Sequence, residues 1–210
     1  MRGAAAVGTA AALALAAIGG CRIATVRPLD EKGAPAAGAA GASGPFDAVA
    51  FVDSIWRSEV LRSLDGAADV GTIAGGGASF ADDSAGRPHP LVVRGRGRVV
   101  DVDTRSRSGT ATVALDGEAH ATVVLQVGPV ITGTAIRDAL PALGFDRFVN
   151  QIQHADVGNE LNARVEREVL QQLDRAGLRG RHVRFVGMAS FEEGLPPRIT
   201  PVRLEVDGQP

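Results

Sequence analysis

The segment Leu91–Val127, LVVRGRGRVVDVDTRSRSGTATVALDGEAHATVVLQV, decides the fold of this chain. Within it, apolar residues recur at every second position, which is the pattern of half-buried β-strands. We predict three consecutive strands, at 91–103, 110–115 and 120–127. The last two are joined by the turn Asp116-Gly117. The segment therefore folds as a three-stranded meander.

The first of these strands changes phase in its middle. Before the change, three arginines share one face, and small or apolar residues occupy the other. After it, we expect two valines inside and two aspartates outside. A phase change beside two glycines indicates a sharp bend or a bulge, as small barrels require. The residues are Arg94, Arg96 and Arg98 against Val93, Gly95, Gly97 and Val99, then Val100 and Val102 against Asp101 and Asp103.

Two further strands, at 182–191 and 198–206, flank a Gly-Leu-Pro-Pro loop. Pro201 indicates that the last strand is an edge or carries a bulge. Three strands, a helical insertion and two strands is the order of an OB-type barrel. We therefore predict an α+β protein: an OB-like five-stranded β-barrel over 91–206 with a small helical subdomain inserted between strands three and four, at about 133–178, and an N-terminal helix before it.

The helices are predicted from apolar residues at three- and four-residue spacing. Segment 46–90 is expected to be helical at its start, with Asp47 as the cap, and to end in a loop. The insertion is expected to hold three helices, the first capped by Thr134 and the third carrying the ion pairs Glu160–Arg164 and Arg164–Glu168. The stripes are Val49, Val52, Trp56, Val60 and Leu64 in the N-terminal helix, Phe145, Phe148, Val149 and Ile152 in the second inserted helix, and Val157, Leu161, Val165, Val169 and Leu173 in the third.

The first 45 residues predict export and a lipid anchor. Residues 1–20 carry an arginine followed by an apolar run too short to span a bilayer, which is typical of a signal peptide. The run ends in Ile18-Gly19-Gly20-Cys21, which resembles the bacterial lipobox, and Cys21 is the only cysteine. We expect cleavage before Cys21, lipid attachment there, and a flexible Ala/Gly/Pro tether over 21–45. The folded part then works in the cell envelope, on the extracytoplasmic side of a bacterial membrane.

Several function classes find no support in the sequence. The four histidines are scattered, so no metal site is expected. No Gly-x-Ser-x-Gly elbow and no phosphate-binding glycine loop is present, so neither an enzyme nor a cofactor is expected. The first three strands contain no aromatic residue on which bases could stack, and the net charge is −2, so nucleic acid is not an expected partner.

The polar residues that follow the third strand are the candidate ligand or partner site. They are Gln126, Arg137, Asp138, Asn150, Gln151, Asn159 and Asn162, with Gly128, Pro129 and Gly133 as candidate structural turns. Two readings stay open: these groups pin the insertion to the barrel mouth, or they form a polar pocket or docking surface. Arg137 lies in the first turn of a helix, where the macrodipole disfavours a cation. We expect its partner to be a carboxylate from another element or an anionic ligand, because Asp138 points elsewhere on a helix.

Several motifs together resemble domain-of-unknown-function family 2291, a family of predicted bacterial periplasmic lipoproteins. They are FD at 46–47, VDSIW at 52–56, VVDVDTRSRSG at 99–109, QVGPV at 126–130, GTAIRDALP at 133–141, FVNQI at 148–152 and ITPVRL at 199–204. The match runs from about Cys21 to Val206 and departs from the family pattern at 67–90. The resemblance implies an OB-like domain with a helical part and genes near sugar-type ABC importers, but no reaction.

The expected function is a non-enzymatic accessory or docking lipoprotein of the envelope, linked to a sugar-type ABC importer. The alternative is a module that binds a small solute between barrel and helical insertion. An enzyme of unrecognised type is the third hypothesis. Recovery of a permease with the protein favours the first, and a ligand-induced shift in melting temperature favours the second.

Overall fold

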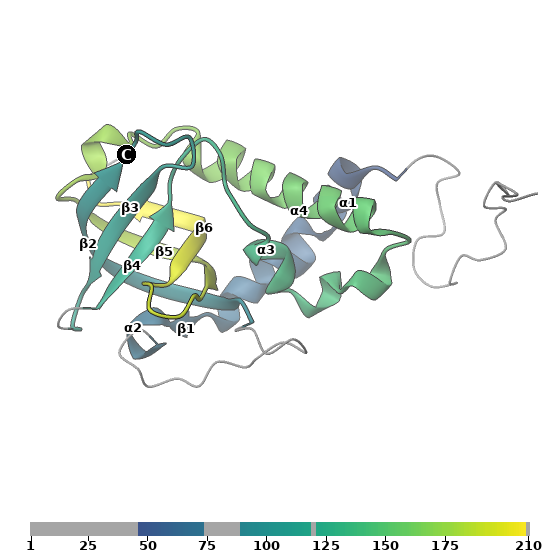
Figure 1. Ribbon diagram of the computed structural model, residues 1–210, viewed down its shortest axis with the longest axis horizontal. Helices are drawn as coiled ribbons and strands as arrows, with labels where there is room; N and C mark the ends of the chain where they lie inside the picture. The colour runs from purple at the N-terminus through teal and green to yellow at the C-terminus, as the bar shows by residue number, and fades with distance from the viewer. Residues whose placement is uncertain (1–45, 74–88, 119–120, 209–210) are drawn as a thin grey trace, which may run out of the picture. The chain divides into compact units, whose positions relative to one another are not determined.

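A computed structural model describes residues 46–73, 89–118 and 121–208 (Figure 1). All of them belong to one compact unit of the chain. The predicted signal peptide, Cys21 and the tether lie outside the described residues, as does most of the predicted loop before residue 90. None of the helices in the described segments is long and apolar enough to cross a membrane.

Five strands form a closed barrel. They pair in the order β2-β3-β4-β6-β5, and β5 pairs back onto β2. Every pairing in the ring is antiparallel except that of β4 with β6, which is parallel. This order confirms the predicted OB-like barrel. The strands are β2 (Leu91–Asp103), β3 (Thr110–Leu115), β4 (Thr122–Gln126), β5 (His182–Ser190) and β6 (Arg198–Val206), and a short β1 (Ala68–Asp69) pairs in parallel with β2.

The barrel interior is filled by alternate residues of its strands. Val99, Val113, Leu125 and Phe185 are among its buried side chains, and full burial of such a side chain contributes roughly 1.5–3 kcal/mol. Gly97 is required by the close approach of the neighbouring strand, because a Cβ there would lie 2.1 Å from the carbonyl oxygen of Ala114. The apolar residues at every second position of the sequence are therefore the ones that face the interior of the barrel.

The predicted phase change in β2 is a bulge between Val99 and Asp101. Val99 faces Val113 before it, and Val102 pairs with Ala111 after it. The expectation that Val100 turns inward is wrong, because the bulge removes this residue from the ladder and leaves its side chain exposed.

The proline of the last strand also marks a bulge, as predicted. Gly187 of β5 pairs with Pro201 while its neighbour Val186 pairs with Arg203, so Val202 is the extra residue. Since β6 has β4 on one side and β5 on the other, it is not an edge strand.

The N-terminal helix begins at α1 (Ala48–Ile55), where the Asp47 carboxylate accepts hydrogen bonds from two backbone N–H groups of the first turn. It continues as a π-helical segment, Trp56–Leu61, and a 3₁₀ turn, Leu64–Gly66. A one-turn helix, α2 (Val70–Thr72), follows β1. The predicted stripe is buried except for Val49, which is exposed because Phe46, Ala48 and Phe51 make the contacts at this end of the helix.

The insertion contains α3 (Ala135–Asp138) and the longer α4 (Gln151–Val165), which continues as a π-helical segment, Glu166–Leu170. Three 3₁₀ turns are Pro141–Leu143, Phe145–Arg147 and Ala176–Leu178, the last of which leads to β5. The turn Phe145–Arg147 lies at the start of the segment where a second helix was predicted. The predicted second helix is wrong because the Asn150 side chain caps α4, accepting from the backbone N–H of Gln153, and so starts a new helix there.

The helices form a second apolar core on the outside of the barrel. α1 packs against α4, and the core includes Trp56, Leu161, and Met188 and Val202 from the outer faces of β5 and β6. The helical subdomain predicted from the two apolar stripes is therefore present, and it is fixed to the barrel wall. Figure 1 shows α1 and α4 side by side, away from the strands β2 and β3.

Candidate functional site

The polar residues predicted as one site lie in three separate places. Gln126 is enclosed between barrel and insertion, Arg137 and Asp138 lie on a groove beside the barrel, and the amides of α4 are spread along that helix. Each place has its own geometry.

Gln126 is a structural clamp. Its side chain is 2% exposed. Its Nε2 donates to the carbonyl of Thr132 at 3.1 Å and to Oγ1 of Thr200 at 2.8 Å. Its Oε1 accepts from the backbone N–H and the hydroxyl of Thr132, both at 2.9 Å. Both donors and both acceptor positions of the amide are thus used within the protein, which is the pinning role considered for this residue.

The glycines on the loop after β4 allow backbone conformations and contacts that a side chain would prevent. A Cβ on Gly128 would lie 2.4 Å from the backbone carbon of Ser108, so the loop can pass the β2–β3 connection only without a side chain there. Gly133 has φ +83°, in the left-handed region that favours glycine. Pro129 lies between them. These positions have the geometry expected of structural turns.

Arg137 finds its partner in the next residue. Its Nε donates to Oδ1 of Asp138 at 2.8 Å and its second terminal nitrogen lies 2.7 Å from the same oxygen, while Nη1 donates to the carbonyl of His154 at 3.3 Å. Thr134 donates its hydroxyl to the other Asp138 oxygen at 2.6 Å and does not cap α3. The expectation of a carboxylate from another element is therefore wrong. α3 spans only Ala135–Asp138, so Arg137 and Asp138 both lie at its C-terminal end.

This pair belongs to a groove between the insertion and the barrel, with a volume of about 850 Å³. The walls come from the segment before β2, from α3 and the 3₁₀ turns after it, from α4, and from the residues after β5. The lining residues other than Arg137 and Asp138 are His89, Pro90, Leu140, Pro141, Leu143, Gly144, Phe145, His154, Phe191, Glu192 and Glu193.

The groove combines rings with carboxylates. The His154 ring lies 5.5 Å from the Phe145 ring and 5.1 Å from the Phe148 ring, and its Nε2 is 3.2 Å from the carbonyl oxygen of Leu143. Glu192 and Glu193 follow β5 directly. Such a set can hydrogen-bond to the hydroxyl or amino groups of a small solute and pack a ring against its apolar side.

Most residues of this groove were not predicted from the sequence. The two glutamates carry no periodic signal, and His154 was one of four scattered histidines. The OB strand order could have predicted part of the groove. It places the end of the fourth barrel strand, β5, next to the helical insertion, and Glu192 and Glu193 follow that strand. Within the described segments, no three His, Cys, Asp or Glu side chains come together as a metal site would need.

The amides of α4 serve different ends. Asn150 caps the helix and Gln151 beside it is exposed. Asn162 donates to the carbonyl of Gly133 at 2.8 Å and so fastens α4 to the loop. Asn159 is exposed and lines, with Asn162, a smaller hollow of about 250 Å³ against residues 129–131.

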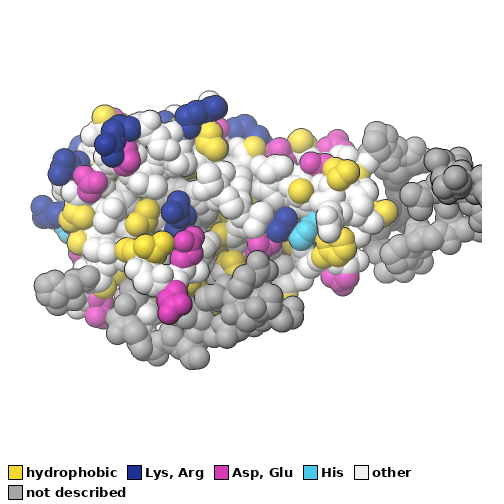
Figure 2. All heavy atoms as spheres, in the orientation of Figure 1, with side chains coloured by type: hydrophobic (Ala, Val, Ile, Leu, Met, Phe, Trp, Pro, Cys, Tyr) yellow, Lys and Arg dark blue, Asp and Glu magenta, His cyan; other side chains and the backbone are white. Residues whose placement is uncertain are grey.

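Three large apolar side chains between the end of α3 and the first turn of α4 are exposed: Phe145 by 50%, Val149 by 72% and Ile152 by 71%. We call them the apolar end. Beside them the buried Phe148 packs edge-on to Phe46 and Phe51, with ring centroids 6.2 and 5.6 Å apart. Figure 2 shows hydrophobic side chains, in yellow, on this part of the surface. The predicted apolar stripe implied that these three residues are buried. Asn150, a helix-capping residue between Val149 and Ile152, was the sequence feature that argued against one continuous helix there.

Comparison with solved structures finds an OB-fold protein from Thermotoga maritima, whose crystal structure aligns with a TM-score of 0.57 and 20% identity over 78% of this chain and all of the other. At that identity the likeness concerns the fold. No curated protein matches the chain. A family described as predicted periplasmic lipoprotein (DUF2291) matches residues 11–205. Its match covers the barrel, the helical part and the segment around Cys21, and the chain belongs to this family of predicted periplasmic lipoproteins.

Proposed function

We propose that this lipoprotein is a non-enzymatic accessory protein that docks through its apolar end onto a membrane-embedded partner, the permease of a sugar-type ABC importer. The observation that carries the proposal is the exposure of Phe145, Val149 and Ile152 within eight residues of chain. Single exposed apolar residues are ordinary on a monomer, whereas a group of them marks an interaction surface.

The apolar end is held rigidly. Phe148 is buried against Phe46 and Phe51, and Asn150 fixes the start of α4. Arg147 adds a contact, with its guanidinium 5.4 Å from the centroid of the Phe51 ring. A surface that keeps its shape loses little conformational entropy on binding, which favours docking.

The position of the apolar end suits a partner in the membrane. Phe46, whose ring touches that of Phe148, is the residue at which the lipid-anchored N-terminal chain joins the folded part. A lipid anchor confines the protein to the membrane surface and raises its effective concentration toward a membrane-embedded partner. Aromatic and aliphatic side chains are the groups that usually dominate such interfaces.

The test uses the lipidated full chain in its native membrane. A photo-crosslinking residue at Val149 is expected to capture an importer permease, identified by mass spectrometry. The variant Val149→Ser/Ile152→Ser should lower recovery of that permease about tenfold or more, because interface hot spots contribute 2 kcal/mol or more. Leu195→Ser is the matched control: Leu195 is 58% exposed on the β5–β6 loop, and recovery should not change.

Two results would reject docking onto a permease. One is equal recovery with wild type and the double variant. The other is crosslinking from Val149 to phospholipid alone, which would assign the apolar end to the bilayer surface instead.

The groove of about 850 Å³ beside Arg137 favours a second candidate function, the binding of a small polar solute. Its test is a thermal-shift screen of monosaccharides against wild type and the variant Glu192→Gln/Glu193→Gln. A sugar that raises the melting temperature of wild type but not of the variant supports the solute site. No shift with any sugar, or the same shift in both proteins, rejects it. Glu166→Gln, in the separate hollow on α4, is the control.

A further inference from the structure

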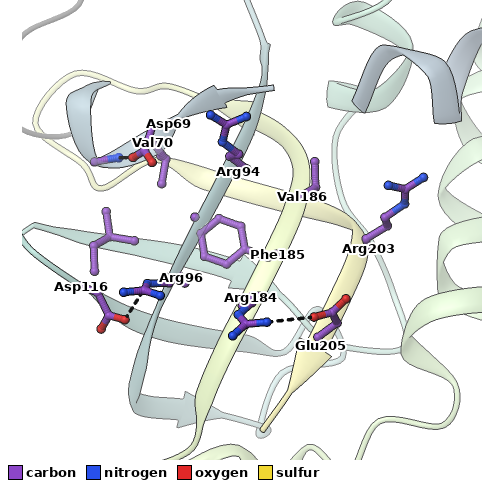
Figure 3. A pocket seen from close by; sticks show the side chains of 13 residues that line it. Asp69, Val70, Arg94, Arg96, Asp116, Arg184, Phe185, Val186, Arg203 and Glu205 are labelled. Atoms are coloured by element: carbon purple, nitrogen blue, oxygen red, sulfur yellow. Dashed lines mark hydrogen bonds and ion pairs between the residues drawn. The ribbon is translucent and has the colours of Figure 1, made fainter. Parts of the chain in front are cut away.

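The outer face of β2, β5 and β6 carries two neighbouring rows of charged side chains. Register places Arg94 beside Val186 and Val186 beside Arg203, and in the next row Arg96 beside Arg184 and Arg184 beside Glu205. Since neighbouring strands lie about 4.8 Å apart, the Cα atoms of Arg94 and Arg203 are separated by roughly two strand spacings, or about 10 Å. Figure 3 shows these two side chains on either side of Val186.

Two of the four arginines in this pair of rows each lie near a carboxylate. Nε of Arg96 lies 3.2 Å from Oδ2 of Asp116, and Nη1 of Arg184 lies 3.9 Å from Oε2 of Glu205. Within residues 46–73, 89–118 and 121–208, no carboxylate lies within ion-pair distance of Arg94 or of Arg203.

A third carboxylate near these rows is also committed. Asp69 caps α2, where Oδ1 accepts from the backbone N–H of Gly71 at 2.8 Å. This carboxylate, at the side of Arg94, is thereby held on the one-turn helix. Asp69 keeps its negative charge and is the Cα partner of Arg94 across β1 and β2, but within the described part of the chain neither Arg94 nor Arg203 forms an ion pair.

The same residues surround a hollow of about 440 Å³. Phe185 and Val186 lie along it, and β1 with α2 forms its side beyond Arg94 (Figure 3). The volume falls within the range of small-molecule sites, roughly 300–1,000 Å³. The hollow thus offers an apolar surface with two uncommitted cations across it.

We propose that this hollow binds an anion that bears a phosphate group. Guanidinium groups bind carboxylates and phosphates through paired N–H donors. A carboxylate has two oxygens in one plane, which a single guanidinium fills, whereas the free oxygens of a phosphate group, three in a monoester and two in a diester, are arranged tetrahedrally, so two guanidinium groups can share them. Arg94 and Arg203 provide two such groups on either side of Val186. A free organic phosphate and a phospholipid headgroup share this chemistry.

The proposal is tested with the mature chain, residues 21–210, carrying Cys21→Ser so that no lipid is attached. Inorganic pyrophosphate is titrated by calorimetry at low and at physiological salt. Arg94→Ala and Arg203→Ala should each weaken binding about tenfold or more, because each removes charge-assisted hydrogen bonds. Arg105→Ala removes one positive charge beyond the other end of β2, where Arg105 is highly exposed, and should leave binding unchanged.

A second arm distinguishes the sources of the phosphate. Vesicles of phosphatidylglycerol and of phosphatidylcholine are sedimented with the same four proteins. Retention on phosphatidylglycerol alone, lost in both hollow variants and displaced by pyrophosphate, assigns a lipid headgroup. Pyrophosphate binding without vesicle retention assigns a soluble phosphate.

Three outcomes would overturn the phosphate site. They are the absence of binding at millimolar pyrophosphate, an equal loss in Arg105→Ala, and a strong preference for a single-stranded oligonucleotide over pyrophosphate that depends on Arg94. The last result would make this face a nucleic-acid surface.

Discussion

The guanidinium of Arg164 lies over the indole ring of Trp56, 4.6 Å from its centroid, and joins the two long helices of the subdomain. The same group binds Asp53 of α1 and, with Nε at 2.8 Å, Glu168 one turn further along its own helix. Glu160 pairs with Arg167 at 2.7 Å instead of the expected Arg164. One arginine therefore combines a cation–π contact with two ion pairs across the α1–α4 contact.

Replacement of this arginine should loosen the helical subdomain. We expect Arg164→Ala to lower the free energy of unfolding by about 1–3 kcal/mol, because a partly desolvated cation–π contact and the packing of the side chain are lost together. Arg167→Ala is the control, since Arg167 is half exposed and its pair should contribute less than about 1 kcal/mol. Urea denaturation followed by Trp56 fluorescence measures both. Equal losses in the two variants would contradict the special role of Arg164.

The clamp formed by Gln126 gives a second stability test. Gln126→Ala leaves Oγ1 of Thr200 and the backbone N–H of Thr132 without their partner. Thr200 is buried, and leaving its hydroxyl unsatisfied costs about 1–3 kcal/mol. Thr132 is exposed, so water can replace the lost partner of its N–H, and we expect a total loss of about 1–3 kcal/mol. Asn159→Ala, on the exposed side of α4, should stay within about 0.5 kcal/mol of wild type. A loss below about 1 kcal/mol in Gln126→Ala would show that the loop is held by other contacts.

A substitution of Arg137 distinguishes a structural role of this residue from a role in ligand binding. Its side chain is 13% exposed and binds Asp138 and the His154 carbonyl. Breaking a fully buried pair costs about 3–5 kcal/mol; because Asp138 is partly exposed, we expect Arg137→Ala to lose about 1.5–3 kcal/mol. Chemical denaturation measures this loss, and Arg179→Ala, at an arginine that is 72% exposed just after the insertion, is the control. Unchanged stability together with a lost solute response would assign Arg137 to the groove as a ligand-binding residue.

The strands were predictable because each buries one face. In Thr110–Leu115, alternation alone gives the strand bounds and the inward residues Ala111, Val113 and Leu115 that the structure has. The bulge at Val100 was visible as a phase change, but its position was not, since a one-residue shift of the bulge gives nearly the same pattern.

The helical insertion was less predictable, for a physical reason. Apolar residues at helical spacing around Phe148 do not share one environment. Phe148 packs against α1, whereas Val149 and Ile152 are exposed. Spacing does not distinguish a core from an interaction surface. The polar residues predicted as one site do not come together for a similar reason. Gln126 and Asn162 are polar because their side chains donate hydrogen bonds to backbone carbonyls of the loop after β4.

The β2–β3 connection predicts a local pH dependence. The side chain and then the backbone N–H of Arg105 bind Asp103 and hold the pKa of its carboxyl below the ordinary value. A lowered folded-state pKa stabilises the fold above the unfolded pKa of about 3.9, and that contribution is lost as pH falls through the folded pKa. Arg105→Ala should raise the Asp103 midpoint toward about 3.9, measured by carboxyl NMR titration. Arg107→Ala in the same connection should leave it in place; the same midpoint in all three proteins would contradict the assignment.

The lipid anchor is tested at Cys21, the only cysteine of the chain. Cys21→Ala removes the thiol that accepts the lipid, so the cell should accumulate uncleaved or misprocessed precursor that takes up no labelled fatty acid. Arg22→Ala keeps the thiol and the residues before it, and should be labelled like wild type. Labelling with palmitate and the intact mass of the mature protein measure both. Stable anchoring takes two or more acyl chains, so the mature wild-type mass should exceed that of residues 21–210 by a diacylglycerol at least. A mature protein with a bare N-terminus at residue 21 would reject lipidation at Cys21.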